Sequence, residues 1–315
     1  MAPDRSPTFF DHVGRVVDRF DALLPFVVVP FGLSLLEFEN VRRALDSAGG
    51  FSLNVEFAFP TPLLDLWSFA DPPPATGRAG PSTGVPGDHG PTDPTGAPGS
   101  DITIETPVET IAMSLEGVGI ELLTWLGLAL LAYAAISAVV AAGYVGGIDR
   151  RLRGEPAAIL ECVVAYAPRL FLYHLVVFGA FVAVVPFLVV APPLLLLAVP
   201  VVIVLGYLFY AVPFLFVVAD AGFLEAFRRS AEFGLDGGSY FWFALWHVVA
   251  AAGISIVLSV LVSAGAVGFL LALFVASPAA LVLTATTVSF VQALTDDGGE
   301  TTSDRSRPGT ASTSP

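Results

Sequence analysis

Two histidines are the residues of this sequence whose type and placement most clearly allow chemistry. His174 (in YHLVVFG) and His247 (in WHVVAAG) each lie a turn or two inside a long apolar stretch. Ionisable side chains are costly inside a membrane, so they mark candidate functional sites. If the two rings face each other, they form an intramembrane polar pair or a pH-sensitive contact. Alternatively, each histidine makes its own hydrogen bond near the membrane interface.

A cluster of charges lies between two apolar stretches, in DAGFLEAFRRSAEFGLDGG. Glu225 precedes Arg229 by four residues, and Arg228 precedes Glu232 by four, the spacing at which side chains meet on a helix. The apolar residues of this segment share the other face of the helix: Phe223, Leu224, Phe227, Ala231 and Leu235. Such a helix lies in the membrane interface, where Glu225, Arg228 and Arg229 are candidate contacts to lipid headgroups or to a partner. The alternative is a structural elbow that turns the chain between two spans.

No other pattern predicts a catalytic or metal site. The sequence lacks Ser-His-Asp order, HExxH and CxxC, and its glycine-rich GYVGGIDR lacks the lysine of a phosphate loop. The spacing of Asp88, His89 and Asp93 fits no compact metal site. Cys162 is the only cysteine, which excludes an intrachain disulfide, and its apolar neighbours favour a buried side chain. We therefore expect no cofactor, no metal and no enzymatic activity.

The composition points to a protein that lives in lipid. Of the 315 residues, 55% are hydrophobic and 13% are charged, whereas soluble domains carry about 25% charge. All fourteen basic residues are arginines, and 28 carboxylates give a formal net charge of −14. An acidic excess of this kind keeps a surface hydrated and predicts a halophilic source. Because no basic patch is available to neutralise phosphates, we expect no nucleic-acid partner.

The elements that must position these residues are long apolar stretches, since a membrane-spanning helix needs about 20 apolar residues. Six stretches meet or approach this length: 22–36, 117–148, 168–190, 193–219, 239–265 and 266–294. The first is short and contains two prolines, and the boundary between the last two is the least distinct. The membrane domain therefore covers 22–294, between an N-terminal segment (1–21) and a disordered acidic tail (295–315).

Arginines beside the spans predict the orientation, because cytoplasmic loops are enriched in Lys and Arg. They flank the connection between the second and third spans (150–169) and the connection between the fourth and fifth (228–229). Both connections and both termini then lie on the cytoplasmic side, with Arg42 and Arg43 as the exception. Each connection predicts an amphipathic elbow helix, the first after Pro156 and the second in the charged cluster.

The stretch between the first two spans predicts an external loop, residues 38–116. Between Phe38 and Ile120 it carries eleven carboxylates and three arginines, a net charge of −8. FSLNVEFAF (51–59) and DITIET (101–106) alternate apolar and polar residues, which is typical of half-buried strands. The insert at 71–100 has eight prolines and seven glycines in 30 residues, a composition typical of disorder.

A resemblance to known families rests on the charged cluster. The string GFLEAFRRSAE followed by GGSYFWF resembles a segment of several prokaryotic multi-pass families, including the membrane domain associated with some glycerophosphodiester phosphodiesterases. The shared G-x-x-E-A-x-R-R-S pattern is matched by Gly222, Glu225, Ala226, Arg228, Arg229 and Ser230. The whole chain is also similar to an uncharacterised haloarchaeal multi-pass membrane protein family. The pattern covers about twenty residues and implies an elbow before a span, with no catalytic residues attached.

These observations predict an all-α membrane protein with about six transmembrane helices, two cytoplasmic amphipathic elbow helices and a small β-containing external loop. We expect it in the cell membrane, as a non-enzymatic protein whose partners are membrane lipids and a further membrane protein. One alternative is a transporter or permease subunit whose path is lined by prolines: Pro186, Pro192, Pro193, Pro200 and Pro213. The other alternative is a lipid-modifying membrane enzyme.

Overall fold

A computed structural model describes residues 7–46, 55, 57, 59–72, 101–105, 110–114, 120–190 and 194–304, and side chains within 7–45, 55–72, 124–184 and 196–296. Eleven helices, two short 3-10 turns and two strands lie in these residues. They are α1 (Phe9–Val17), α2 (Phe20–Leu23), η1 (Leu24–Val27), α3 (Val28–Leu36), α4 (Phe38–Asp46), η2 (Leu66–Ser68), β1 (Asp101–Glu105), β2 (Thr110–Ser114), α5 (Ile120–Arg153), α6 (Ile159–Val190), α7 (Leu194–Phe209), α8 (Val212–Val218), α9 (Phe223–Asp236), α10 (Ser239–Ser263) and α11 (Gly265–Asp304).

Five of the described segments are long and apolar enough to cross a membrane. They are Thr124–Arg153, Ile159–Val184, Leu196–Val218, Ser239–Ser263 and Gly265–Asp296. A sixth arises if the N-terminal pair, Phe9–Val17 and Phe20–Leu36, counts as one span with a bend of 75°. The chain is therefore a multi-pass, helical membrane protein, and the predicted number of apolar spans is confirmed within this range.

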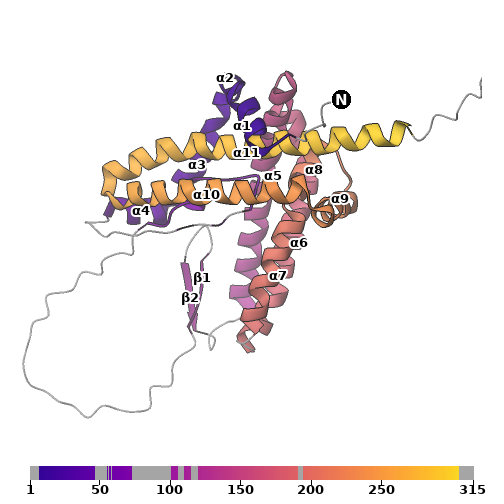
Figure 1. The fold of residues 1–315 in the computed structure, drawn as a ribbon. Coiled ribbons are helices and arrows are strands. Elements are labelled where there is room, and N and C mark those ends of the chain that lie inside the picture. The colour runs from indigo at the N-terminus through magenta and orange to yellow at the C-terminus, as the bar shows by residue number, and fades with distance from the viewer. Residues whose placement is uncertain are drawn as a thin grey trace, which may run out of the picture.

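Two helical hairpins make up the body of the molecule (Figure 1). One consists of α5 and α6, and the other of α10 and α11, which run across the first pair in this view. The short helix α8 contacts α5, α6, α9 and α11, and all of its residues, Val212–Val218, are buried. The N-terminal helix α1 lies along α11, so the first and the last described helices pack against each other.

The fourth span is broken into two helices with different surroundings. Pro213 has no backbone N–H, and its ring clashes with the carbonyl of the residue four positions earlier, which is Phe209, the last residue of α7. The side chains of α7 between 196 and 205 are largely exposed, as expected for a helix in lipid, whereas α8 is packed inside the protein. The break thus separates a lipid-facing half from a core half.

Three features of the structure bear on the sequence-based boundaries. Within the predicted N-terminal segment, α1 packs on the body and its Val16 is fully buried. The stretch after Pro156 is not a separate elbow, since α6 begins at Ile159 and continues into the span. The backbone of α11 remains helical to Asp304, beyond the predicted start of the tail at 295. The predicted boundary near Gly265 is confirmed by the turn between α10 and α11.

The predicted β-structure of the external loop is not supported at 51–59. Val55, Phe57 and Phe59, the described residues of the expected strand at 51–59, lie in irregular structure. The backbone of 101–105 pairs instead with 110–114 in a short antiparallel hairpin. Residues 73–100, most of the expected disordered insert, lie outside the described part of the chain, as do the insert's Asp88, His89 and Asp93.

Part of the external loop is packed into the membrane domain, which the sequence did not indicate. Leu64, Leu66 and Phe69 are buried, and the ring of Trp67 stacks on Phe269 of α11 at 5.9 Å. The backbone N–H of Leu66 donates to Ser34 Oγ at 2.9 Å, and Trp67 Nε1 donates to the Ser34 carbonyl at 2.7 Å. Residues 63–70, which we call the external cap, therefore pack against the end of α3 and the start of α11.

The glycines of α5 allow its close approach to α6 and η1. A Cβ at Gly146 would lie 2.6 Å from the Cβ of Cys162, far inside contact distance. A Cβ at Gly143 would touch Ile159 at 3.0 Å, and one at Gly147 would collide with the ring of Phe26. Gly143 and Gly147, which are four residues apart, therefore allow close packing, as small residues do between membrane helices.

Replacing Gly146 by Val should destabilise the protein by about 1–3 kcal/mol, because the added side chain forces α5 and α6 apart. Gly127→Val is the matched control, since a Cβ at Gly127 of the same helix meets nothing within 4 Å. Thermal unfolding in detergent measures both variants. Equal losses for the two would show that helix propensity, and not the contact with α6, decides the effect.

Two carboxylates, the half-buried Glu37 and the buried Asp65, lie where the external cap meets the end of α3. Burial and the nearby Asp65 carboxylate raise the pKa of Glu37 to about 7, against a partly compensating hydrogen bond from Asn40 Nδ2 at 2.5 Å. Burial also raises the pKa of Asp65, whose carboxylate accepts hydrogen bonds from Ser68.

We expect stability to fall as the pH rises from about 4.5 to 7 and to level off above that range. The folded state binds a proton at Glu37 more tightly than the unfolded state does, so raising the pH removes stability. Thermal unfolding across pH 4–9 measures this slope. Glu37→Gln should flatten it and leave the low-pH stability close to wild type, and an unchanged slope would place its origin elsewhere.

Candidate functional site

The two membrane histidines do not form the predicted pair. His174 Nδ1 hydrogen bonds to the Leu170 carbonyl in its own helix, at 2.8 Å. His247 is fully buried, and neither of its ring nitrogens has a hydrogen-bond partner among the described residues. The two rings therefore make no hydrogen bond to each other, and His174 fits the alternative of a locally satisfied histidine.

The charged cluster forms α9 with the predicted ion pairs. Arg229 lies 2.5 Å from Glu225, and Arg228 lies 3.5 Å from Glu232. Leu224 and Leu235 of the predicted apolar face are about 80% exposed, so they do not pack into the protein. The buried face consists instead of the small residues Ala226, Ser230 and Gly234.

Small residues on α9 allow it to lie tightly against α7. Ser230 Oγ donates to the Leu208 carbonyl at 2.7 Å, and Tyr207 Oη donates to the Gly234 carbonyl at 3.0 Å. A Cβ at Gly234 would lie 2.8 Å from the side chain of Leu208. The elbow is thus fixed in place. Each of its two arginines is paired with a glutamate of the same helix.

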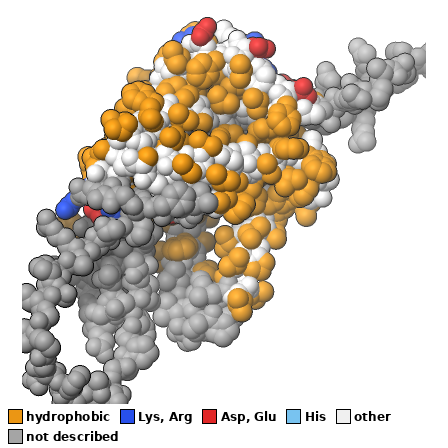
Figure 2. Space-filling view, turned by 60° about the vertical axis from the view of Figure 1, so that its left-hand side comes forward, with side chains coloured by type: hydrophobic (Ala, Val, Ile, Leu, Met, Phe, Trp, Pro, Cys, Tyr) orange, Lys and Arg blue, Asp and Glu red, His pale blue; other side chains and the backbone are white. Residues whose placement is uncertain are grey.

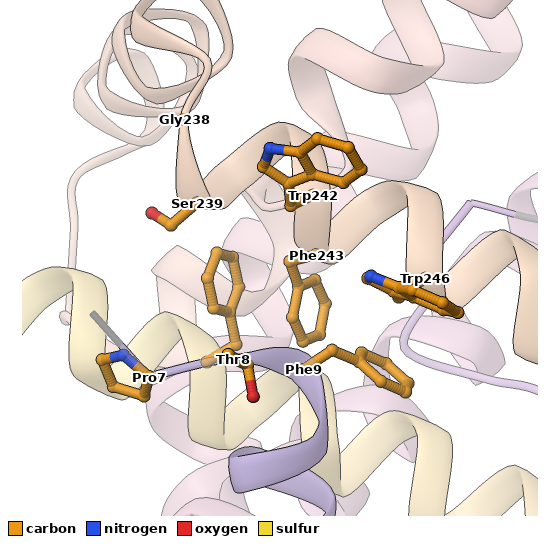
Figure 3. Close-up of a pocket in the computed structure, with 9 residues that line it drawn as sticks. Pro7, Thr8, Phe9, Gly238, Ser239, Trp242, Phe243 and Trp246 are labelled. Atoms are coloured by element: carbon orange, nitrogen blue, oxygen red, sulfur yellow. The ribbon is translucent and has the colours of Figure 1, made fainter. Parts of the chain in front are cut away.

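An aromatic pocket of about 400 Å³ lies beside this elbow, between the start of α1 and the start of α10 (Figure 3). Its lining is mainly apolar and joins three elements that are far apart in the sequence: Pro7, Thr8, Phe9, Gly238, Ser239, Trp242, Phe243, Trp246 and Phe290. Trp242 and Trp246, from successive turns of α10, remain about half exposed at its edge. We call this the aromatic pocket and treat it as the candidate site.

The sequence builds the aromatic pocket in two steps. Gly237 and Gly238 have positive φ angles of 69° and 54°, which residues with a Cβ rarely adopt, and they turn the chain so that α10 begins at Ser239. Trp242 and Trp246 then follow one helical turn apart and so share a face. On the opposite side, Thr8 caps α1 in a reciprocal hydrogen-bond arrangement with Asp11 that fixes the start of the helix.

Stacked rings form the floor of the aromatic pocket. Phe243 of α10 and Phe290 of α11 are nearly parallel, with their centroids 3.9 Å apart. Phe9 of α1 packs on Phe243 at 5.4 Å. The buried ring of His12 approaches Phe290 at 5.6 Å and hydrogen bonds to Ser289 Oγ at 3.0 Å. The floor therefore depends on contacts among three helices.

A buried polar cluster at the end of α5 connects this helix to α8 and α11, and it was not predicted from the sequence. Asp149 Oδ1 accepts a hydrogen bond from Gln292 Nε2 of α11 at 2.8 Å and one from Arg153 Nε at 3.2 Å. Arg153 also donates to the Val218 carbonyl at the end of α8. The lone glutamine in an otherwise apolar span was the available signal.

Arginines of the N-terminal segment cap the same end of α5. Arg19 and Arg15 both donate to the carbonyl of Leu152, one of the last carbonyls of the helix. Carbonyls at a helix end lack partners within the helix, and cations are favoured there. These contacts place α1 and its connection beside the C-terminus of α5.

The outer surface is mainly apolar (Figure 2). Charged side chains gather at the upper end and at the left edge of this face, and apolar side chains cover most of the coloured surface between them. Within the described part of the chain, no three His, Cys, Asp or Glu side chains gather as a metal site would require. The chemistry offered by the aromatic pocket is apolar contact and ring stacking, with the Ser239 hydroxyl at its edge.

Asp149→Ala should destabilise the protein by about 2–3 kcal/mol, because it leaves the buried Gln292 amide and the Arg153 guanidinium without their carboxylate. The matched control is Asp220→Ala, which breaks the pair with Arg169 at a carboxylate that is 72% exposed. That variant should lose less than about 1 kcal/mol in thermal unfolding. A small loss for Asp149→Ala as well would mean that packing alone holds α5 to α11.

No family model matches the chain, and the searches of curated proteins and of solved structures found no similar protein.

Proposed function

We propose that the chain is a non-enzymatic membrane protein that binds a membrane lipid, with an acyl chain of the lipid in the aromatic pocket. The observation that carries the proposal is the position of an apolar, ring-lined pocket at the first two turns of the span α10. Tryptophan side chains favour this depth, because their amphipathic rings sit at the headgroup level of a bilayer. The volume of about 400 Å³ lies within the range of small-molecule sites.

The surroundings of the aromatic pocket also support a lipid as the occupant. Phe241, Trp242 and Val249 of α10 are exposed and apolar, so an acyl chain in the pocket continues onto a surface that faces lipid. The exposed Leu224 and Leu235 of α9 fit an interfacial helix. The headgroup contact predicted for Arg228 and Arg229 receives less support, because each has a glutamate partner on α9.

The contacts at the end of α5 support the proposed orientation, with both termini on the cytoplasmic side of the cell membrane. Arg19 of the N-terminal segment meets the end of α5, and Gln292 near the end of the last span meets Asp149. Segments from both ends of the chain therefore lie beside the arginine-rich connection after α5, the side that the arginine bias assigns to the cytoplasm. The acidic composition of the loop and tail supports a halophilic source.

The two alternative functions receive less support. A transporter path lined by prolines would need them to face a shared interior, but Pro200 is exposed to the surroundings and Pro213 is buried in packed α8. The side chains of Pro186, Pro192 and Pro193 lie outside the described residues. A lipid-modifying enzyme would need a reactive group at the bound lipid, whereas the pocket lining offers rings, proline, glycine and two hydroxyls.

The test is the lipid that remains bound after purification. We expect the variant Trp242→Ala/Trp246→Ala to retain several-fold less lipid than wild type by mass spectrometry, because it removes the two rings at the pocket edge. Trp125→Ala is the matched control, since Trp125 is 66% exposed on α5 and lies outside the pocket. Thermal unfolding confirms that each variant is folded.

Equal lipid retention by folded double variant and control would overturn the proposal. A second copy of the chain or another membrane protein that co-purifies, and that is lost only from the double variant, would identify a protein as the occupant instead. The identity of the retained lipid then distinguishes a selective site from a surface that holds bulk lipid.

A further inference from the structure

His247 is a fully buried polar side chain that the proposed lipid site does not use. It lies one helical turn beyond Phe243 on α10, eight residues after the helix begins at Ser239. At 1.5 Å per residue this corresponds to a depth of about 12 Å along the helix. Neither ring nitrogen has a hydrogen-bond partner among the described residues.

Thr286 of α11 is a second buried polar side chain without a hydrogen-bond partner among the described residues. Because α10 and α11 are consecutive antiparallel helices and Phe243 stacks on Phe290, moving one turn along each helix brings His247 level with Thr286. The Thr286 hydroxyl is buried and without a described partner. By contrast, Thr287 donates to the Leu283 carbonyl at 3.0 Å, the ordinary solution for a hydroxyl inside a helix.

The hydrogen-bonding capacity of these two side chains is complementary to a small neutral molecule. A neutral imidazole offers one N–H donor and one acceptor nitrogen, and a threonine hydroxyl offers a donor and an acceptor. Buried polar groups nearly always have a partner, which in protein interiors is commonly an ordered water. A cation is not favoured, because no carboxylate or thiolate accompanies His247 in a metal-binding group of the described residues.

We propose that His247 and Thr286 bind a single water molecule between α10 and α11, directly beneath the floor of the aromatic pocket. The water accepts from one group and donates to the other, which satisfies both orphaned side chains. The stacked rings of Phe243 and Phe290 separate this polar site from the aromatic pocket. The site does not depend on lipid binding, so its test is independent of the test of the proposed function.

Thermal unfolding of isosteric variants tests the site. If the water is bound, Thr286→Val removes one of its partners and lowers the Tm, and the loss in Thr286→Val/His247→Leu is smaller than the sum of the single losses. Thr287→Val is the matched control, because the Thr287 hydroxyl is satisfied within α11 and should show no coupling to His247→Leu. A raised or unchanged Tm for Thr286→Val, or fully additive losses, would show a dry site and refute the proposal.

A structure of the wild-type protein in lipid, at a resolution that shows ordered water, separates water from a direct contact. The expected result is density within hydrogen-bond distance of both a His247 ring nitrogen and Thr286 Oγ1. A direct bond between the two side chains, or a bond from His247 to any other protein group, would overturn the proposal even if the unfolding cycle shows coupling.

Discussion

The carboxylate of Asp149 is the contact on which the arrangement of the helices most depends. It is buried near the C-terminal end of α5 and binds Gln292 of α11, and Arg153 extends the link to the end of α8. A buried charge is tolerated only when it is paired and hydrogen bonded, so these partners cannot move independently. The crossing of the two hairpins is therefore fixed by a polar cluster within an otherwise apolar body.

The aromatic pocket exists because of that crossing. Its walls come from α1, α10 and α11, and α1 is held to α11 by the hydrogen bond between His12 and Ser289. Arg15 and Arg19 attach the same helix to the end of α5. The nine-residue helix α1 therefore contributes to the aromatic pocket at its start and is attached to the end of α5 through Arg15 and the neighbouring Arg19.

The sequence predicted features that depend on local composition and spacing. Apolar stretches located the spans, and the four-residue spacing predicted the pairs of Arg228 and Arg229 within α9. Features that need contacts between distant segments could not be predicted, since no pattern states that Phe9, Trp242 and Phe290 meet. The buried face of α9, made of Ala226, Ser230 and Gly234, was not predicted for a related reason. In a membrane protein the lipid-facing side takes leucines, and the protein-facing side takes small residues.

The chain is acidic as a whole, whereas the residues that line its candidate site are uncharged. The loop between Phe38 and Ile120 alone carries a net charge of −8. Among the helices, Arg150, Arg153 and Arg169 each have a carboxylate within 4 Å, as do both arginines of α9. The residues that line the aromatic pocket carry no charge, so an occupant would meet apolar surface and aromatic rings there. If the occupant is a lipid, as we propose, such a site discriminates between lipids through their chains more than through their headgroups.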